Sequence, residues 1–256
     1  MPALSDGKMS PDMNVCRLAF VGVIFQLSGI SPIRAQFSAD SLLYKESISS
    51  LHRIYLSEIG DNAQIYHGSE YIRYGLKANG FPYYESDSML TGSVNYQGNI
   101  YTDMNLFYNL VTDEIIIHDY QHNAFITLPH GKVGFFTIGS HEFIELVNKQ
   151  SVGLRVDGFY EQLFSGEPGL FVRREKRLDV GSGSEETKYI QYNTYWLRKN
   201  NRYFMVESKT SLLDLLKDQE DLLKKYIRTN KLKFRIKKDL ESSLVLTTMY
   251  YSQLKH

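Results

Sequence analysis

Between Thr91 and Val147, short runs of β-branched and aromatic residues alternate with glycine, asparagine and aspartate. Such runs are typical of β-strands, and the polar residues between them are typical of turns. The runs are 100–108, 115–117, 124–128, 132–138 and 142–147. The pattern predicts an antiparallel meander, with a tight hairpin at 96–99 in which Gly98 has a positive φ.

The distribution of polar positions within these runs indicates which strands are covered. From Ile100 to Tyr108 the even positions are mainly apolar, whereas the odd positions include Asp103 and Asn105. This alternation predicts a strand with its even positions on the apolar face and a wetter opposite face. The run 115–117 is apolar throughout, which predicts a central strand.

Two further hairpins are predicted after a polar link at 148–153. The first spans 158–176 with its turn at 165–169, and the second spans 188–207 with an Asn-containing turn at 199–202. Segment 181–186 has the composition of a loop. Before the meander, 40–59 has the pattern of a helix, segments 64–67 and 70–74 favour extended structure, and 79–82 is predicted to be a turn.

At Ser208 the apolar period changes from 2 to 3.6, which predicts a helical stripe capped by Thr210 or Ser211. Asp218 and Asp221 resemble a second cap, so the stripe is expected to be one helix or two short ones. Another helix is predicted from Asp239. The stripe is expected to pack on the sheet beside 104–106 and 115–117. Its residues are Leu212, Leu215, Leu216, Leu222, Leu223, Tyr226 and Ile227.

These elements predict an α+β fold that is mostly β. We expect an antiparallel meander sheet or open barrel, with an N-terminal helix and two or three C-terminal helices packed on it. Residues 36–256 are expected to form a single β-rich domain with a helical C-terminal segment at about 209–256.

Residues 1–35 have the order of features found in secretory signal peptides. Lys8 and Arg17 precede the apolar run 18–27, and Ala35 is a small residue at a suitable cleavage site. The run is shorter than the roughly 20 residues that span a bilayer. A buried N-terminal helix or strand is the alternative. The expected location is therefore the periplasm or outer membrane of a Gram-negative envelope, or the exterior.

Composition removes several classes of chemistry. Cys16 is the only cysteine and would leave with the signal, so a disulfide, a thiolate metal site or a cysteine nucleophile is not expected. The chain has 29 basic and 29 acidic residues, which gives no general reason to expect a nucleic-acid partner. No transmembrane segment is expected after signal cleavage.

Several local motifs stand out: 80–84 (GFPYY), 92–101 (GSVNYQGNIY), 106–110 (LFYNL) with 113–116 (DEII), 158–166 (GFYEQLFSG) and the tail from 209 to 234. Together they resemble a family of uncharacterised exported β-rich proteins of Gram-negative bacteria. The resemblance spans nearly all of residues 36–256. It implies export and one β-rich unit with C-terminal helices, and it implies no activity.

Candidate catalytic and metal-binding residues are sparse. His118 and His122 are four residues apart, with Asp119 as a third potential ligand, but their position at a strand end favours surface histidines. Ser140 precedes His141, a spacing that rarely forms a triad. The segment 181–184 lacks the nucleophile motif of serine hydrolases, and no phosphate-binding glycine motif occurs. No catalytic, cofactor or metal residue is therefore predicted, and no cofactor is expected.

Two surface features suggest partners. Tyr192, Tyr195 and Trp196 would form a sugar-stacking platform if they were exposed, although tyrosines spread over every strand are more simply part of a twisted sheet. The segment 224–238 has eight basic residues and no acidic one, which suits anionic lipid or polysaccharide. Its position toward the end of a predicted helix is also explained by the helix dipole.

The sequence favours a non-enzymatic exported cell-envelope protein that binds or supports an envelope protein or glycan. A carbohydrate-binding module that uses the Tyr/Trp surface is the first alternative. A hydrolase with dispersed carboxylates is the second.

Overall fold

The computed structural model describes residues 64–73, 78–181 and 186–255. The expected signal peptide at 1–35, the expected helix at 40–59 and the middle of the expected loop at 181–186 lie outside these ranges. The described residues all belong to one unit of the chain, 47–256.

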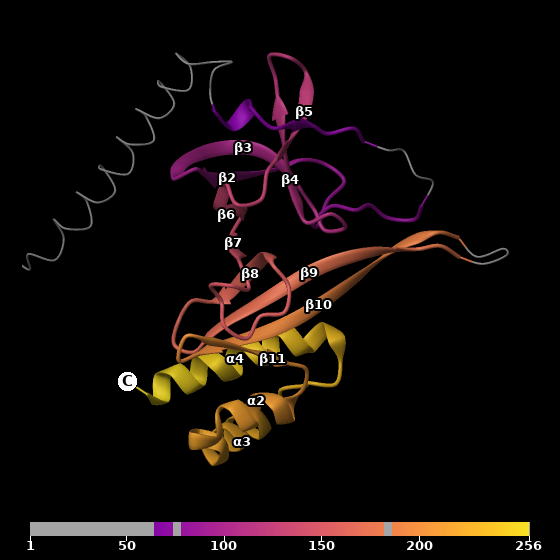
Figure 1. Cartoon of the computed structure of the whole chain (residues 1–256). Helices are drawn as coiled ribbons and strands as arrows, with labels where there is room; N and C mark the ends of the chain where they lie inside the picture. Colours follow the sequence, from indigo (N-terminus) through magenta and orange to yellow (C-terminus); the bar gives the residue numbers. More distant parts are fainter. Residues whose placement is uncertain (1–63, 74–77, 182–185, 256) are drawn as a thin grey trace, which may run out of the picture. The chain divides into compact units, whose positions relative to one another are not determined.

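An antiparallel sheet of eleven strands dominates the described residues (Figure 1). The strands are β1 (Ser69–Glu70), β2 (Leu90–Tyr96), β3 (Asn99–Asn109), β4 (Glu114–Asp119), β5 (Ala124–Leu128), β6 (Val133–Ile138), β7 (His141–Leu146), β8 (Gly158–Phe164), β9 (Gly169–Asp179), β10 (Lys188–Lys199) and β11 (Arg202–Val206). Their order is β1-β5-β4-β3-β2-β6-β7-β8-β9-β10-β11. The predicted meander is thus interrupted once, because β6 pairs with β2 instead of with β5.

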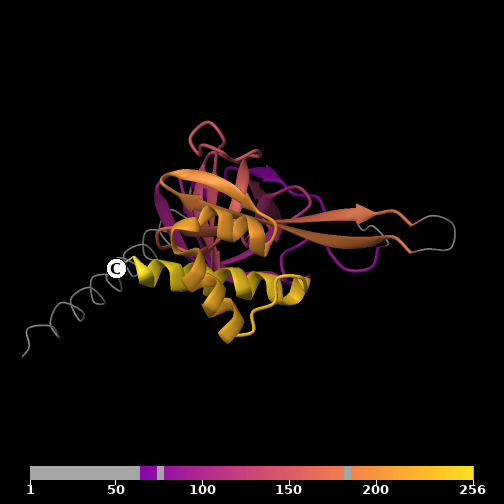
Figure 2. The ribbon, with the colours of Figure 1, turned by 90° about the horizontal axis from the view of Figure 1, so that it is seen from below.

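The predicted hairpin turns are confirmed. Gln97 and Gly98 have φ of 51° and 86°, and Asn200 and Asn201 have φ of 53° and 57°. Two consecutive residues with positive φ match the twist of the flanking strands, which explains the glycine and asparagines at these positions. The β9–β10 ribbon pairs from Asp179–Lys188 to Gly169–Arg198 and is the long two-stranded arm in Figure 2.

The predicted alternation along β3 is wrong at its start. Gly92 pairs with Met104 and Val94 pairs with Tyr101, so β3 has one more residue than β2 at this point. Asp103 has a φ of 57° in this bulge. A bulge reverses the faces of all residues before it. Tyr101 is therefore buried, whereas Ile100 is 46% exposed.

Two further expectations about extended segments have different outcomes. Gln64–Tyr66 forms a 3-10 helix, not a strand, and Ile65 is buried in the core. The predicted central strand is confirmed, since β4 lies between β3 and β5 and residues 115–117 are 0% exposed.

The helices are α2 (Lys209–Leu215), the 3-10 helix η3 (Lys217–Gln219), α3 (Glu220–Thr229) and α4 (Lys237–Leu254). The expected stripe is therefore divided. Ser208, not Thr210 or Ser211, caps α2, and Ser211 completes the capping box. Asp218 does not cap α3; it lies in η3 and accepts hydrogen bonds from Tyr251.

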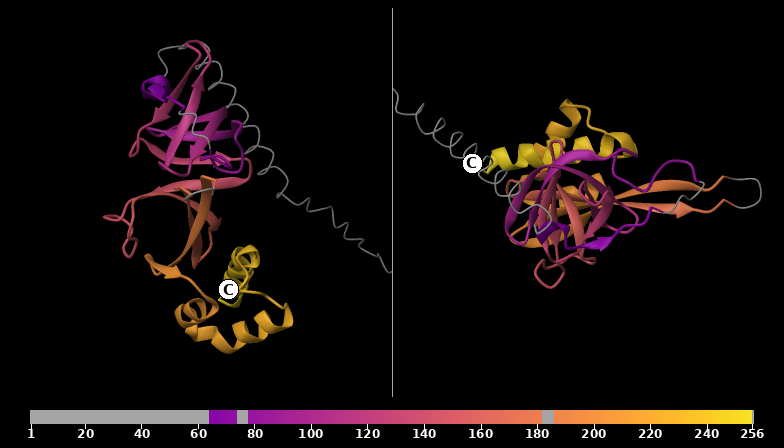
Figure 3. Two further views of the ribbon diagram at one scale, coloured as in Figure 1. Left: turned by 90° about the vertical axis from the view of Figure 1, so that its right-hand side faces the viewer. Right: turned by 90° about the horizontal axis from the view of Figure 1, so that it is seen from above.

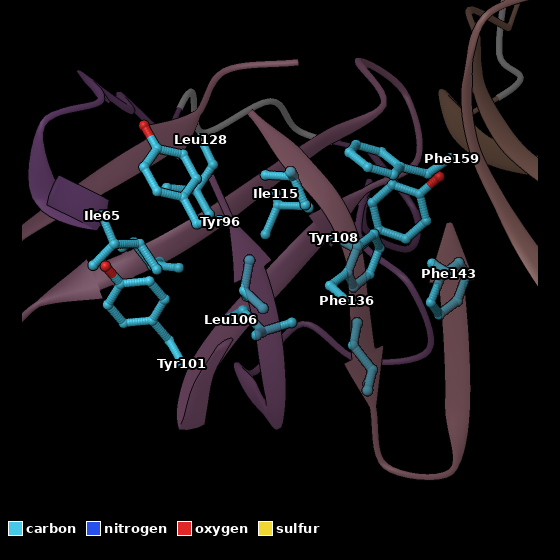
Figure 4. Packing of buried hydrophobic residues seen from close by; sticks show 14 of the residues in the cluster. Ile65, Tyr96, Tyr101, Leu106, Tyr108, Ile115, Leu128, Phe136, Phe143 and Phe159 are labelled. Carbon is cyan, nitrogen blue, oxygen red and sulfur yellow. The ribbon is translucent and has the colours of Figure 1, made fainter. Parts of the chain in front are cut away.

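The residues between β2 and β8 enclose an aromatic core. Phe136 and Phe143 stack with ring centroids 4.7 Å apart, and the Tyr108 ring contacts both edge-on (Figure 4). The buried members include Ile115, Ile117 and Leu106. On the opposite face, Tyr83, Phe107 and Ile116 form a smaller cluster.

The helices cover a different part of the sheet from the one predicted. Leu212, Leu216 and Leu223 pack with Leu170, Val172, Tyr195, Leu197 and Val206 of β9–β11, not with Leu106, Ile115 and Ile117. The pattern of the stripe predicts that a face is buried, but it does not specify which strands cover it. No helix among the described residues has the length and apolar character needed to cross a membrane.

Candidate functional site

Residues 79–84 form a strap that crosses the sheet. The amide of Tyr189 in β10 donates to the carbonyl of Asn79 at 3.0 Å, and the amide of Tyr84 donates to the carbonyl of Tyr108 in β3 at 2.8 Å. Because β3 and β10 are not neighbours in the sheet, the strap links two distant strands.

Lys176 of β9 fixes the middle of the strap. Its Nζ donates to the carbonyl oxygens of Phe81 at 3.0 Å and Tyr83 at 2.6 Å, and lies 4.2 Å from the centroid of the Phe81 ring. Burial lowers the pKa of Lys176. These contacts hold the Phe81 side chain in a fixed position.

A cavity of about 740 Å³ lies beside the strap. Its walls come from six parts of the chain: residues 69–73, the strap, Asp87 in the loop after the strap, the β3–β4 turn, the end of β5, and β9–β10. A cavity of this size lies within the range of small-ligand sites. Its aromatic, proline and aliphatic lining residues are Tyr71, Ile72, Phe81, Pro82, Tyr83, Val111, Leu128, Pro129, Leu178 and Tyr189.

The apolar lining is partly accessible. Ile72 is 60% exposed and Val111 is 44% exposed, and Tyr71, Phe81 and Tyr189 are half-buried. Partly exposed apolar side chains gathered around one concavity are typical of a binding site.

The floor of the cavity is rigid. The buried Tyr83 ring stacks on Phe107 at 4.1 Å, and its hydroxyl lies 3.1 Å from that of Tyr71. Burial raises the pKa of Tyr83, so the hydroxyl stays protonated. Arg73 pairs with Asp87 and lies over the Tyr83 ring at 5.4 Å.

Polar groups also line this cavity. They include the carboxylates of Glu70, Asp87 and Glu114, the amide of Asn109, and the side chains of Ser69, Thr112, Thr127 and His130. Three carboxylates face one arginine in this lining, so the cavity disfavours a strongly anionic ligand.

A second cavity, of about 430 Å³, adjoins the other side of Phe81 and is lined by an ion cluster. The buried Glu161 of β8 accepts from Arg174 and lies 2.5 Å from Nδ1 of His141. Arg174 also donates to both oxygens of Glu241 in α4 at 3.0 Å, and Tyr195 donates to Glu241 at 3.1 Å. These five residues are called the ion cluster.

The contacts within the ion cluster shift the pKa values of Arg174 and Tyr195. Burial opposes the charge on Arg174, but its hydrogen bonds to Glu241 and Glu161 and their charges together outweigh burial and raise the pKa of the guanidinium. Burial, followed by the charge of Glu241, raises the pKa of Tyr195 to about 12. The contact between Glu161 Oε1 and Nδ1 of His141 favours the tautomer in which Nδ1–H donates to the carboxylate.

His141 and Glu161 resemble the base and the orienting acid of a catalytic triad, in that order, but the nucleophile is missing. No serine or threonine hydroxyl within the described ranges hydrogen-bonds to His141, and Ser140 is exposed in the β6–β7 turn. The ion cluster therefore joins β7, β8 and β9 to α4 without a catalytic nucleophile.

The histidines near 118–122 have ordinary structural contacts. The His118 ring packs against Tyr120 and Phe125, and His122 pairs with Asp119 at 2.7 Å. Burial opposes ionisation of Asp119, but the hydrogen bonds from the His122 side chain and from the backbone amides of His122 and Gln121 together outweigh it and lower the pKa of the carboxyl. Within the described residues, no group of three or more histidine, cysteine, aspartate or glutamate side chains is placed to hold a metal ion.

The expected Tyr/Trp platform is not formed. Tyr195 and Trp196 are 6% and 4% exposed and lie in different core clusters, because adjacent strand residues point to opposite faces. Tyr192 is 42% exposed, but it does not line either cavity.

Sequence reasoning missed the strap as part of a site. Its one local signal is the Gly80-Phe-Pro-Tyr-Tyr84 segment, in which four ring-bearing residues follow a glycine with φ of 85°. The chain matches no protein-family model, no curated protein and no solved structure. The chemistry of the two cavities is therefore inferred from their own side chains.

Proposed function

We propose that this protein is an exported cell-envelope protein that binds a neutral carbohydrate in the cavity beside the strap. The observation that carries the proposal is the lining of that cavity, in which partly exposed aromatic rings surround groups that pair with hydroxyls. The aromatic residues differ from the platform expected at Tyr192, Tyr195 and Trp196.

The chemistry of sugars fits both parts of the lining. A sugar ring presents apolar C–H faces, which the rings of Tyr71, Phe81 and Tyr189 match. Its hydroxyls both donate and accept, and the carboxylate of Glu114 and the amide of Asn109 supply both functions. The excess of carboxylates favours a neutral sugar over an acidic one.

Export is part of the proposal and depends on residues 1–35. The charged, apolar and small-residue segments are arranged as in a cleavable signal, and the motifs at 80–84 and 158–166 resemble exported proteins. We expect the native protein to begin at Gln36, which mass spectrometry of an envelope fraction would test. A mature pool that retains Met1 or Met9 would contradict export by cleavage at this site.

Binding is tested with a glycan array followed by calorimetry on the best glycan. Phe81→Ala and Tyr189→Ala should each weaken binding by about tenfold or more, as for aromatic residues that carry binding energy. Tyr192→Ala is the matched control, since this partly exposed tyrosine lies on the same strand as Tyr189 but outside the cavity. Loss of binding in the control alone would place the site on the outer surface of β10.

A glycoside hydrolase is the second candidate, because the carboxyls of Glu70, Asp87 and Glu114 line the same cavity. Glycosidases use two carboxyl groups on opposite sides of the scissile bond. Incubation with the bound glycan distinguishes the two functions. Binding without release of new reducing ends supports the non-enzymatic function. Release that stops in Glu114→Gln would establish the hydrolase.

A further inference from the structure

The basic segment, residues 224–238, presents eight cations to solvent. Every one of these side chains belongs to an exposed residue, and among the residues that the structure describes only Lys224 pairs with a carboxylate, that of Glu220 at 2.7 Å. The cations are Lys224, Lys225, Arg228, Lys231, Lys233, Arg235, Lys237 and Lys238. The whole chain has no net charge, so this concentration of positive charge is local.

The helix dipole accounts for only part of the basic segment. Arg228 lies in the last turn of α3, where a cation is favourable. Lys237 and Lys238 lie in the first turn of α4, where the positive end of the dipole opposes them and only Asp239 offsets it. A structural role therefore does not explain the cations at the start of α4.

The loop between α3 and α4 (Figure 3) is tied to α4 by hydrogen bonds at Lys233. Ser243 Oγ accepts from the amide of Lys233 and donates to its carbonyl, both at 3.1 Å. Leu232 and Phe234 pack against the helical core, whereas Lys231, Lys233 and Arg235 are exposed. The alternation of apolar and basic residues thus presents three cations on the outer side of an ordered loop.

An exposed apolar residue lies among these cations. Ile236 is 49% exposed and precedes the first residue of α4. Cations beside an exposed aliphatic side chain match the boundary of an anionic bilayer, where headgroup phosphates lie next to acyl chains. A soluble anionic polymer would pair with the cations but would offer Ile236 no apolar contact.

We propose that the basic segment docks this protein on a membrane surface rich in anionic phospholipid. The cations contact the headgroup phosphates, and Ile236 enters the interface between headgroups and acyl chains. The basic segment is distinct from the cavity beside the strap, so substitutions in this segment should leave carbohydrate binding unchanged.

The test is co-sedimentation with phosphatidylglycerol-containing phosphatidylcholine vesicles and with pure phosphatidylcholine vesicles. The wild-type protein should sediment with the anionic vesicles only, and less so at high salt. The triple variant Lys231→Glu/Lys233→Glu/Arg235→Glu should bind at least about a hundredfold more weakly, since each basic residue near the surface contributes about fivefold. Ile236→Ser should weaken vesicle binding but leave retention on heparin unchanged.

The matched control is Lys132→Glu/Lys149→Glu/Arg202→Glu, which reverses three exposed cations outside the basic segment. It should bind vesicles like the wild type. Equal loss in both triple variants would show an effect of net charge alone and overturn the proposal. Wild-type protein that binds heparin but neither vesicle would also overturn it and identify a polyanion as the partner. Thermal melts confirm that each variant is folded, and the milder Lys→Gln and Arg→Gln versions replace any that is not.

Discussion

Leu223 and Leu222 are neighbours in α3 with opposite environments. Leu223 is 0% exposed in the core between the helices and β9–β11, whereas Leu222 is 43% exposed. Leu223→Ala should lower the free energy of unfolding by about 2–5 kcal/mol, because it removes buried methyl groups and leaves a cavity. Urea denaturation followed by circular dichroism measures this change.

Leu222→Ala is the control for that substitution. It makes the same chemical change in the same helix, and its effect should stay within about 0.5 kcal/mol, as for most surface positions. If Leu223→Ala unfolds at the same urea concentration as the wild type, Leu223 is not part of the core between α3 and β9–β11.

At the scale of single residues, the sequence predicts backbone conformations that depend on adjacent residues, but it does not predict the partners of a side chain that come from distant parts of the chain. The positive φ of Gly98 and Asn200 follows from turns that involve only adjacent residues. Asp218 resembles a helix cap in sequence, but its carboxylate binds Lys199 of β10, Tyr251 of α4 and Lys255, which follows α4. Those partners are more than fifteen residues away, so no local pattern indicates them.

Arg174 is the side chain that joins α4 to the sheet through Glu161 and Glu241. Arg174→Leu should destabilise the protein by about 3–5 kcal/mol, since it leaves the carboxylate of Glu161, 3% exposed, without its cation. Hydrogen exchange should show the largest loss of protection in α4 and the adjoining strands. Chemical denaturation gives the total change.

Glu241→Gln is the milder comparison at this contact. The Glu241 side chain is 31% exposed, so the loss of its charge is screened and should cost about 1 kcal/mol or less. A double variant, Arg174→Leu/Glu161→Leu, should regain part of the stability, because no buried charge remains unpaired. An Arg174→Leu protein as stable as the wild type would show that the ion cluster does not anchor α4.

Elements are predictable from sequence where their signals are local. The hairpins β2–β3, β8–β9 and β10–β11 follow from alternating runs bounded by turn residues. The pairing of β2 with β6 does not, because it joins segments about forty residues apart. The bulge at Asp103 is equally hidden, since aspartate in a strand is also compatible with a regular solvated position.

The candidate site was less predictable than the fold for the same reason. Residues 69–73, the strap, the β3–β4 turn, the end of β5 and β9–β10 meet only after the sheet has formed. None of them carries a motif with fixed spacing. The sequence pattern identifies the aromatic residues of the strap, but it does not place them beside Tyr189 or Glu114.

Buried tyrosines are distributed through the whole molecule. Tyr160 lies in β8, Tyr195 contacts α4, and Tyr251 lies in α4 itself; burial raises the pKa of each to about 12. Burial also raises the pKa of Tyr84 and Tyr108, which belong to the aromatic core between β2 and β8. Each of these hydroxyls is protonated in the folded protein at a pH where it would ionise in the unfolded chain.

The consequence is a loss of stability at alkaline pH. A group whose folded pKa is raised contributes stability that is complete below its unfolded pKa of 10.0 and is lost as the pH rises toward 12. Each tyrosine removes at most about 1.4 kcal/mol per pH unit in that interval, and Tyr160, Tyr195 and Tyr251 all destabilise the protein in the same direction. Lys176 acts in the opposite direction, because burial lowers its pKa, but one such group does not offset three.

We therefore expect the melting temperature to stay nearly constant from about pH 8 to pH 10 and to fall steeply above it. One part of the tyrosinate absorbance should rise only together with the loss of near-ultraviolet circular dichroism, since the buried hydroxyls ionise only as the protein unfolds, whereas exposed tyrosines contribute without unfolding. Tyr160→Phe should shift the transition to higher pH by removing one ionisable group without changing the ring. A melting temperature that is constant through pH 12 would show that these rings are accessible to solvent and that the packing of the sheet against α4 is looser than described.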